Sequence, residues 1–206
     1  VKVHSSMVYT DGEVRTLGIL NVIASTFSFL GATFIITNYF AFAEFKSNFA
    51  FKLILFVAIG DVINSLGNFM FTPEEGEVLC YLQAFLTQFG DIVSFAWVTA
   101  IAWVIYTVIR AETPPTRNDV EKWYRRIHYI IWPTTFVLSI LPFFTSSYGR
   151  DNGLCWIKYV PPSPWGEVWR WLCFYIPLWG SICFVGFCYW RVWGQLTAPE
   201  APARRN

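Results

Sequence analysis

Charged residues are scarce in this sequence. Only 14% of its 206 residues are Asp, Glu, Lys or Arg, whereas soluble domains average about 25%. Side chains that normally cover a water-exposed surface are therefore in short supply, and 55% of the residues are hydrophobic. The formal net charge of +1 gives no sign of a basic surface for nucleic acid. These shortages argue against an ordinary soluble domain and against a nucleic-acid partner.

Histidine and the usual catalytic motifs are also lacking. The chain has two histidines, His4 and His128, and neither forms a cluster with Cys or carboxylates at metal-ligand spacing. The sequence contains no nucleophile elbow, phosphate-binding loop or dinucleotide fingerprint. We therefore expect no enzyme, and no catalytic residue, metal or cofactor.

Long hydrophobic runs dominate what is present. Five runs carry few or no charges, at residues 17–43, 53–71, 78–109, 129–148 and 171–190. Each is near or above the roughly 20 residues that a helix needs to cross a bilayer, and none shows the alternation of barrel strands. The sequence predicts one all-α domain over residues 1–206, a polytopic bundle of five transmembrane helices in contact with membrane lipid.

The distribution of basic residues predicts the orientation. With the N-terminus outside, ten of the 15 Lys and Arg residues fall on the cytoplasmic side and five outside. Basic residues are enriched in cytoplasmic loops, so we expect an extracellular N-terminus. Cys80 and Cys155 then both lie on the oxidising side, where disulfides persist. This placement favours a Cys80–Cys155 bridge, and the alternative is two unrelated thiols.

The longest charged stretch, residues 110–126, follows the third run. Pro114 and Pro115 end that helix, and we expect a short amphipathic helix capped by Asn118 or Asp119 to lead into the fourth run. Its basic residues either anchor the loop to anionic lipid or, with two aromatic side chains, form a docking surface for a cytoplasmic partner. The residues of this surface are Arg110, Arg117, Lys122, Trp123, Tyr124, Arg125 and Arg126.

Polar groups also occur inside two predicted spans. In the second span they follow the i, i+3, i+4, i+7 spacing of one helical face, and they are Asp61, Asn64, Ser65 and Asn68. The third span offers Gln88, Asp91 and Ser94. A carboxylate facing lipid costs several kcal/mol, so we expect a polar seam between these two helices. It either holds the bundle together or binds an ion or proton, and Asp91 lies at a depth that suits the floor of an outward-facing pocket.

Together these features resemble the first five helices of a G protein-coupled receptor, and more narrowly the slime-mould cyclic AMP receptor family. The matching segments run in the same order: "CYLQAFLTQFGDIVSFAW", "IYTVIRAETPPTRNDVEKWY", "CWI" and "FYIPLWG". The resemblance implies a seven-helix fold, of which this chain holds five helices, so we expect an incomplete receptor domain.

The resemblance also implies a plasma-membrane receptor that passes an extracellular small-molecule signal to a heterotrimeric G protein. A cyclic nucleotide is one such ligand, and it would need positive groups for its phosphate. Candidate ligand contacts in the outer loops are Arg150, Trp156, Lys158 and Arg170. Two other interpretations stay open: a small ion or solute transporter or channel subunit that uses Asp61 and Asp91, and a scaffold of five spans without signalling.

Overall fold

The computed structural model describes residues 11–70, 76–111, 113–151, 154–158 and 165–197. Within them, five helical stretches are long and apolar enough to cross a membrane: Gly12–Ala41, Phe49–Phe69, Val78–Arg110, Arg117–Thr145 and Trp165–Leu196. The helices are α1 (Asp11–Ala41), α2 (Ala43–Ser47), α3 (Phe49–Phe69), α4 (Val78–Arg110), α5 (Arg117–Ile140), α6 (Trp165–Arg170) and α7 (Ile176–Leu196). A 3₁₀ turn (Leu141–Thr145) extends α5, and a π-helical segment (Trp171–Tyr175) joins α6 to α7.

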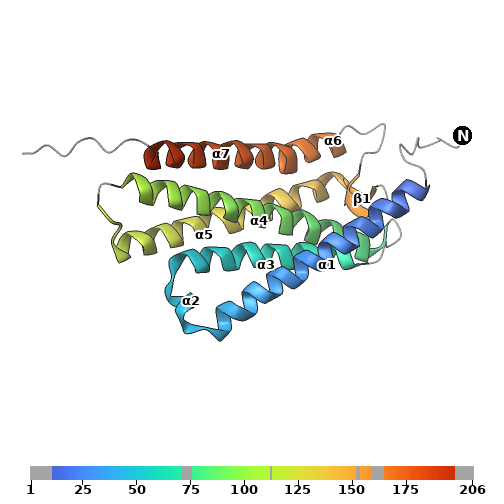
Figure 1. Cartoon of the computed structure of the whole chain (residues 1–206). Coiled ribbons are helices and arrows are strands. Elements are labelled where there is room, and N and C mark those ends of the chain that lie inside the picture. The colour runs from blue at the N-terminus through green and yellow to red at the C-terminus, as the bar shows by residue number, and fades with distance from the viewer. Residues whose placement is uncertain (1–10, 71–75, 112, 152–153, 159–164, 198–206) are drawn as a thin grey trace, which may run out of the picture.

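The long helix α4 lies at the centre of the bundle. It packs against α3, α5 and α7, while α1 crosses α3 obliquely (Figure 1). One end of α4 meets a two-stranded antiparallel hairpin, β1 (Tyr148–Asp151) and β2 (Leu154–Ile157). At the opposite end the chain turns from α4 into α5. The two ends of the bundle therefore carry different structures, a hairpin at one and an α4–α5 connection at the other.

The fourth span differs from its prediction at both ends. Its helix begins at Arg117 rather than near residue 129, because the amphipathic stretch and the apolar run form one continuous α5. The N-cap is Thr116, and not Asn118 or Asp119 as expected. Thr116 Oγ accepts from the backbone N–H of Asp119 at 3.3 Å, and the Asp119 carboxylate accepts in return from the Thr116 N–H at 3.2 Å. This reciprocal capping box satisfies two backbone donors at the helix start.

The far end of the same span was also placed too late in the sequence. The helix gives way to a 3₁₀ turn that begins at Leu141 and contains Pro142. Ser146 then adopts a left-handed conformation, with φ 50°. This turn reverses the chain, so Tyr148 lies in strand β1 and not in the span.

Helices α3 and α4 approach closely through glycine. A Cβ atom at Gly90 of α4 would stand 2.5 Å from the backbone nitrogen of Asn64 on α3. At Gly60 of α3, a Cβ atom would stand 2.5 Å from the hydroxyl oxygen of Ser94. Small residues let helix backbones approach in membranes, where packing and interhelical hydrogen bonds drive association. The glycines therefore bring the polar side chains of the two helices within bonding reach.

The buried core joins α3, α4 and α5. Its centre is Trp97 of α4, which is fully buried and stacks on Phe56 of α3, with ring centroids 4.6 Å apart. His128 of α5 joins this aromatic cluster and accepts a hydrogen bond from Trp132 Nε1 at 2.9 Å. By contrast, α1 exposes large apolar side chains, such as Phe27 (72%) and Phe34 (70%). Because such side chains are stable facing lipid, the arrangement is that of a multi-pass membrane protein.

Candidate functional site

A disulfide fixes the hairpin to the bundle. Cys80, in the first turn of α4, is bonded to Cys155 of β2, and their Cα atoms lie 5.2 Å apart. In the hairpin register Cys155 faces Arg150 of β1. The predicted Cys80–Cys155 bridge is confirmed. It holds the loop between the fourth and fifth spans across the end of α4.

Tyr148 anchors the first strand from within the bundle. Its side chain is fully buried, and its hydroxyl donates to the Ser139 carbonyl of α5 at 2.8 Å. Burial raises the pKa of the Tyr148 hydroxyl above its ordinary value, because the charged phenolate would lose its hydration. The hydroxyl therefore stays protonated at physiological pH, as its role as a donor requires.

Two glutamines of α4 connect the hairpin to other helices. Gln83 Nε2 donates to the Met70 carbonyl, just after α3, at 2.9 Å, while its Oε1 accepts from the Cys155 N–H at 3.0 Å. One turn deeper, Gln88 Oε1 accepts from Trp156 Nε1 at 2.7 Å. Gln88 Nε2 donates to the Cys173 carbonyl at 3.2 Å, inside the π-helical segment. Each amide uses both its donor and its acceptor, so the hairpin is bonded to α4 and, through it, to α3 and the start of α7.

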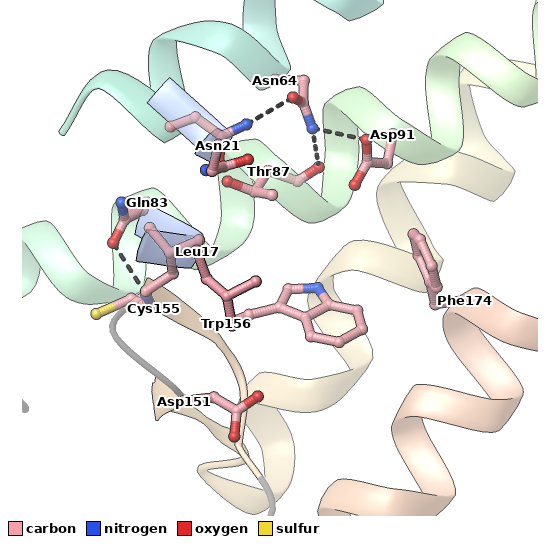
Figure 2. A pocket seen from close by; sticks show the side chains of 12 residues that line it. Leu17, Asn21, Asn64, Gln83, Thr87, Asp91, Asp151, Cys155, Trp156 and Phe174 are labelled. Atoms are coloured by element: carbon pink, nitrogen blue, oxygen red, sulfur yellow. Dashed lines mark hydrogen bonds between the residues drawn. The ribbon is translucent and has the colours of Figure 1, made fainter. Parts of the chain in front are cut away.

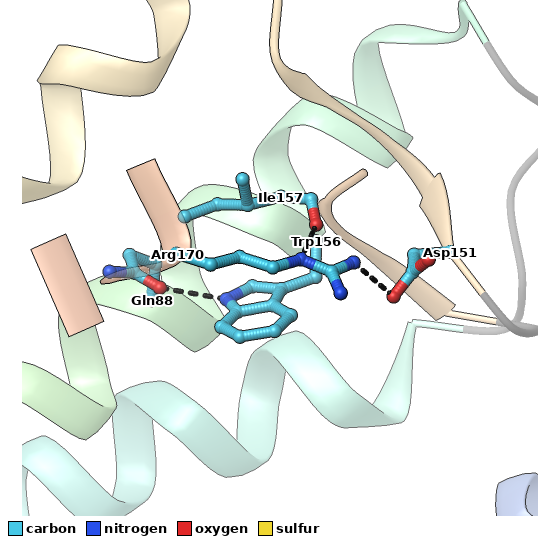
Figure 3. Close-up of polar contacts among 5 residues, drawn as sticks. All are labelled: Gln88, Asp151, Trp156, Ile157 and Arg170. Atoms are coloured by element: carbon cyan, nitrogen blue, oxygen red, sulfur yellow. Dashed lines mark hydrogen bonds and ion pairs between the residues drawn. The ribbon is translucent and has the colours of Figure 1, made fainter. Parts of the chain in front are cut away.

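Arg170 closes the hairpin from the side of α6 (Figure 3). Its Nε donates to the Ile157 carbonyl at 2.7 Å, and its guanidinium pairs with the Asp151 carboxylate. The same guanidinium lies over the Trp156 ring, 5.1 Å from the centroid. Arg170 therefore contacts both strands, and its charge is matched by Asp151.

A cavity of about 390 Å³ lies beneath the hairpin (Figure 2). Side chains from α1, α3, α4, the hairpin and the π-helical segment line it. The lining residues are Leu17, Asn21, Asn64, Asn68, Gln83, Thr87, Asp91, Asp151, Leu154, Cys155, Trp156 and Phe174. The volume falls in the range of small-molecule pockets.

A directed row of amides crosses one side of this cavity. Asn21 of α1 donates to Asn68 Oδ1 at 3.0 Å, and Asn68 donates to Asn64 Oδ1 at 2.8 Å. Asn64 in turn donates to Asp91 Oδ1 at 2.7 Å. The row ends on a carboxylate that accepts hydrogen bonds. It joins three helices through side chains that would otherwise be costly to place in a membrane.

The remaining residues predicted for the seam lie close by. Ser94 of α4 donates to Asp61 Oδ1 at 2.7 Å. The structure thus brings Asp61, Asn64, Asn68 and Asp91 together between α3 and α4, whereas Gln88 bonds the hairpin and the π-helical segment instead. Ser65 is buried, and its hydroxyl has no hydrogen-bond partner among the described residues.

The sequence interpretation missed two side chains of this site. Asn21 belongs to the amide row, although α1 was not assigned to the seam, and Gln83 links α3 to β2. Both are polar residues inside apolar runs, and that was the available signal. The hairpin was also missed, although Asn152-Gly153 is a sequence pair typical of hairpin turns; these two residues lie outside the described part of the chain.

The cavity is rich in acceptor groups. Carboxylates of Asp91 and Asp151 line it together with four side-chain amides, and none of the described lining residues is basic. Of the predicted ligand contacts, Trp156 lines the cavity. Arg150, Lys158 and Arg170 are not among its lining residues, and Arg150 is exposed on β1. The arrangement is suited to a ligand that donates hydrogen bonds or carries a positive charge.

At the opposite end of the bundle, the predicted docking surface divides into two parts. Five basic side chains are exposed: Arg110, Arg117, Lys122, Arg125 and Arg126. The two aromatic side chains turn inward instead. Trp123 packs against Trp103, with centroids 5.7 Å apart, and Tyr124 lies 4.3 Å from the His128 ring. Both aromatic side chains are half-buried, so each keeps only part of its surface for the predicted docking surface, which remains a prediction.

Comparison with known proteins places the chain in a receptor family. A family model described as slime mold cyclic AMP receptor matches residues 8–188. G-protein coupled receptor 1 of Arabidopsis thaliana is 32% identical over 89% of this chain and 53% of its own length. Cyclic AMP receptor-like protein A of Dictyostelium discoideum is 24% identical over 82% of this chain and 43% of its own length. The chain therefore spans about half the length of these two relatives.

A solved structure shows the same fold. Squid rhodopsin superposes with a TM-score of 0.67 at 18% identity, covering 92% of this chain and 57% of that chain. The predicted fold class, an all-α transmembrane bundle of receptor type, is confirmed. From its match over residues 8–188, the chain belongs to the slime mold cyclic AMP receptor family.

Proposed function

We propose that this protein is a plasma-membrane receptor, with its N-terminus outside, that binds a small extracellular ligand in the cavity beneath the hairpin. The observation that carries the proposal is the cavity itself. It combines a disulfide-held hairpin with a row of amides that ends on Asp91. Membership of the receptor family supports the assignment. The ligand acts by favouring one arrangement of the helices through differential contacts.

The lining chemistry favours a cationic or hydrogen-bond-donating ligand over a cyclic nucleotide. A cyclic nucleotide brings an anionic phosphate, for which Arg and Lys are the usual partners. Arg170 and Asp151 form an ion pair and offset each other's charge, so Asp91 is the carboxylate at the cavity wall that is not paired with a basic side chain. Trp156 and Phe174, with centroids 5.2 Å apart, add an aromatic wall that attracts a cation.

We further propose that a heterotrimeric G protein binds at the opposite end, beside the exposed basic start of α5. Electrostatic attraction there would steer the partner and set its orientation. The transporter or channel alternative draws no support from the seam, because Asp61 and Asp91 both accept hydrogen bonds from the neighbouring helix. These contacts favour a structural role for Asp61 and Asp91, in which they hold α3 and α4 together and shape the floor of the cavity.

The test is a ligand screen on the full-length protein with a matched set of amines, neutral amides, carboxylates and cyclic AMP. Thermal stabilisation reports binding, and nucleotide exchange on added G protein reports signalling. We expect amines or neutral hydrogen-bond donors to stabilise the protein. Asp91→Asn should weaken the binding of amines and leave the binding of neutral donors largely unchanged. Binding of cyclic AMP that survives Asp91→Asn would contradict the ligand class, and binding without any nucleotide exchange would contradict G protein coupling.

A further inference from the structure

A second hollow lies between α4, α5 and α7. Its volume is about 270 Å³, and it shares no lining residue with the cavity beneath the hairpin. Apolar side chains form almost all of its wall, including Ile130 of α5 and Phe184 of α7. Thr99, which contributes the hydroxyl in the lining, donates it to the Phe95 carbonyl of its own helix at 2.8 Å. The hollow is therefore an apolar groove with little for a polar ligand to bond.

Small residues on α4 form the floor of this groove. Ala96 and Ala100 stand one turn apart and both line it. Helices α5 and α7 pack on the two sides of α4, and their larger side chains rise above the alanines as walls. Ile130 is 57% exposed and Phe184 is 38% exposed. In a membrane such a groove is filled by whatever apolar chain lies next to it.

A single basic side chain stands at one end of the groove. Arg126 of α5 lines it and is exposed, and no ion pair or hydrogen bond of its side chain occurs within the described part of the chain. It belongs to the third turn of α5, near the end of the bundle that carries the α4–α5 connection. Arg125, its neighbour in sequence, is also exposed but does not line the groove. Arg126 therefore places one positive charge at the end of the apolar groove.

We propose that this groove is a binding site for one anionic membrane phospholipid. An acyl chain lies over Ala96 and Ala100, and the headgroup phosphate binds the Arg126 guanidinium. Arginine suits a phosphate because its planar donors bond two oxygens at once. Cytoplasmic leaflets carry anionic lipids, and basic residues near the surface attract them. This inference rests on the proposed orientation, with the N-terminus outside, but not on the proposed ligand or on the G protein.

The experiment measures lipid retention by the full-length protein in mild detergent. Dioleoyl phosphatidylglycerol or dioleoyl phosphatidylcholine is added, and native mass spectrometry counts the lipids that stay bound. We expect one phosphatidylglycerol to be retained with about fivefold preference, the effect of one basic residue near an anionic surface. Arg126→Gln should abolish this preference, while Arg125→Gln, at the adjacent residue outside the groove, should leave it intact.

A second pair of variants tests the groove rather than the charge. Ala96→Phe should fill the floor and displace the lipid, whereas Val98→Phe, on the exposed side of α4, should not. Circular dichroism and mapping of the Cys80–Cys155 bond check that each variant is folded. If Ala96→Phe does not fold, the smaller substitution Ala96→Leu takes its place. Equal losses from Arg125→Gln and Arg126→Gln would overturn the proposal in favour of diffuse attraction. Phosphatidylglycerol retention that survives Ala96→Phe would also overturn the proposal. So would the finding that the protein forms a dimer that Ala96→Phe disrupts and Val98→Phe does not, because a second copy of the chain would then fill the groove.

Discussion

The side chain of Asn64 donates to Asp91 Oδ1 at 2.7 Å and thereby bonds α3 to α4 beside the cavity beneath the hairpin. The same amide nitrogen also reaches the Thr87 carbonyl at 3.2 Å, and the Asn64 oxygen accepts from Asn68. Asn64 is therefore the point at which the amide row from α1 joins α4. Its loss would leave the Asn68 amide donor and the Asp91 carboxylate without this partner.

This relationship predicts a measurable coupling between the two residues. In a double-mutant cycle with Asn64→Ala and Asp91→Ala, we expect an interaction free energy of about 0.5–2 kcal/mol, the range for polar pairs between membrane helices. Reversible unfolding in mixed micelles provides the free energies. As a control, Asn64→Ala combined with Thr99→Ala should be additive, because Thr99 bonds only its own helix. An additive Asn64–Asp91 pair would show that the contact carries no stability.

The close approach of α3 and α4 predicts an unequal response to alanine at two glycines. Gly90→Ala places a methyl group against the Asn64 backbone, so the helices must separate at a cost of about 1–3 kcal/mol. Gly186→Ala on α7 is the control, because nothing lies within 4 Å of the added atom. Thermal unfolding of the two variants in one detergent makes the comparison. Equal melting temperatures would contradict the packing described for α3 and α4.

The sequence predicted much of the fold and less of the site. Apolar runs locate helices that cross a membrane because the bilayer imposes their length, and the shared oxidising side favoured the Cys80–Cys155 bridge over two unrelated thiols. Helix ends were less predictable, since the start of α5 depends on a local capping box at Thr116 rather than on hydropathy. The cavity lining depends on how helices pack. Asn21 and Asn68 are 47 residues apart, and no periodicity within one helix relates them.

Loss of the disulfide should release the hairpin. Cys80→Ser removes the covalent link to β2, and we expect a loss of about 2–5 kcal/mol in stability or a failure to mature, on the scale of native disulfides in small domains. Unfolding measurements and cell-surface labelling would report the two outcomes. Cys183→Ser is the matched control, because Cys183 is a free, exposed cysteine on α7. A Cys80→Ser protein as stable and as well delivered as the control would contradict this role.

Arg170 should both hold the hairpin in place and contribute to stability. The side chains of its ion pair with Asp151 are only 18% and 19% exposed, and its Nε also donates to the Ile157 carbonyl, so we expect Arg170→Ala to cost about 1–3 kcal/mol in unfolding free energy. Amides of residues 154–157 should exchange faster with deuterium, since the bond to the Ile157 carbonyl is lost. Arg150→Ala, which changes an exposed side chain of β1, should leave the exchange unchanged. If both variants exchange alike, the hairpin is held by the disulfide and the glutamines alone.

Charge reversal at the start of α5 separates docking from lipid attraction. Arg117, Lys122 and Arg125 are exposed, whereas Trp123 and Tyr124 are half-buried and contact Trp103 and His128. In the full-length protein, replacing the three basic residues with glutamate should slow G protein activation on the order of tenfold, because electrostatic steering sets the encounter rate. Nucleotide exchange at two salt concentrations is the measurement, and the defect should shrink at high salt as screening weakens the charges.

Replacement of the same three residues with glutamine is the matched control, since it removes attraction without adding repulsion and should give a smaller defect. Arg126 is left unchanged in both variants because it borders the lipid groove. If the glutamate variant activates G protein normally, these side chains serve the membrane and not a partner. If it fails to reach the surface with its N-terminus outside, they serve topology. Docking requires the third result, in which surface delivery and ligand binding are preserved and only activation falls.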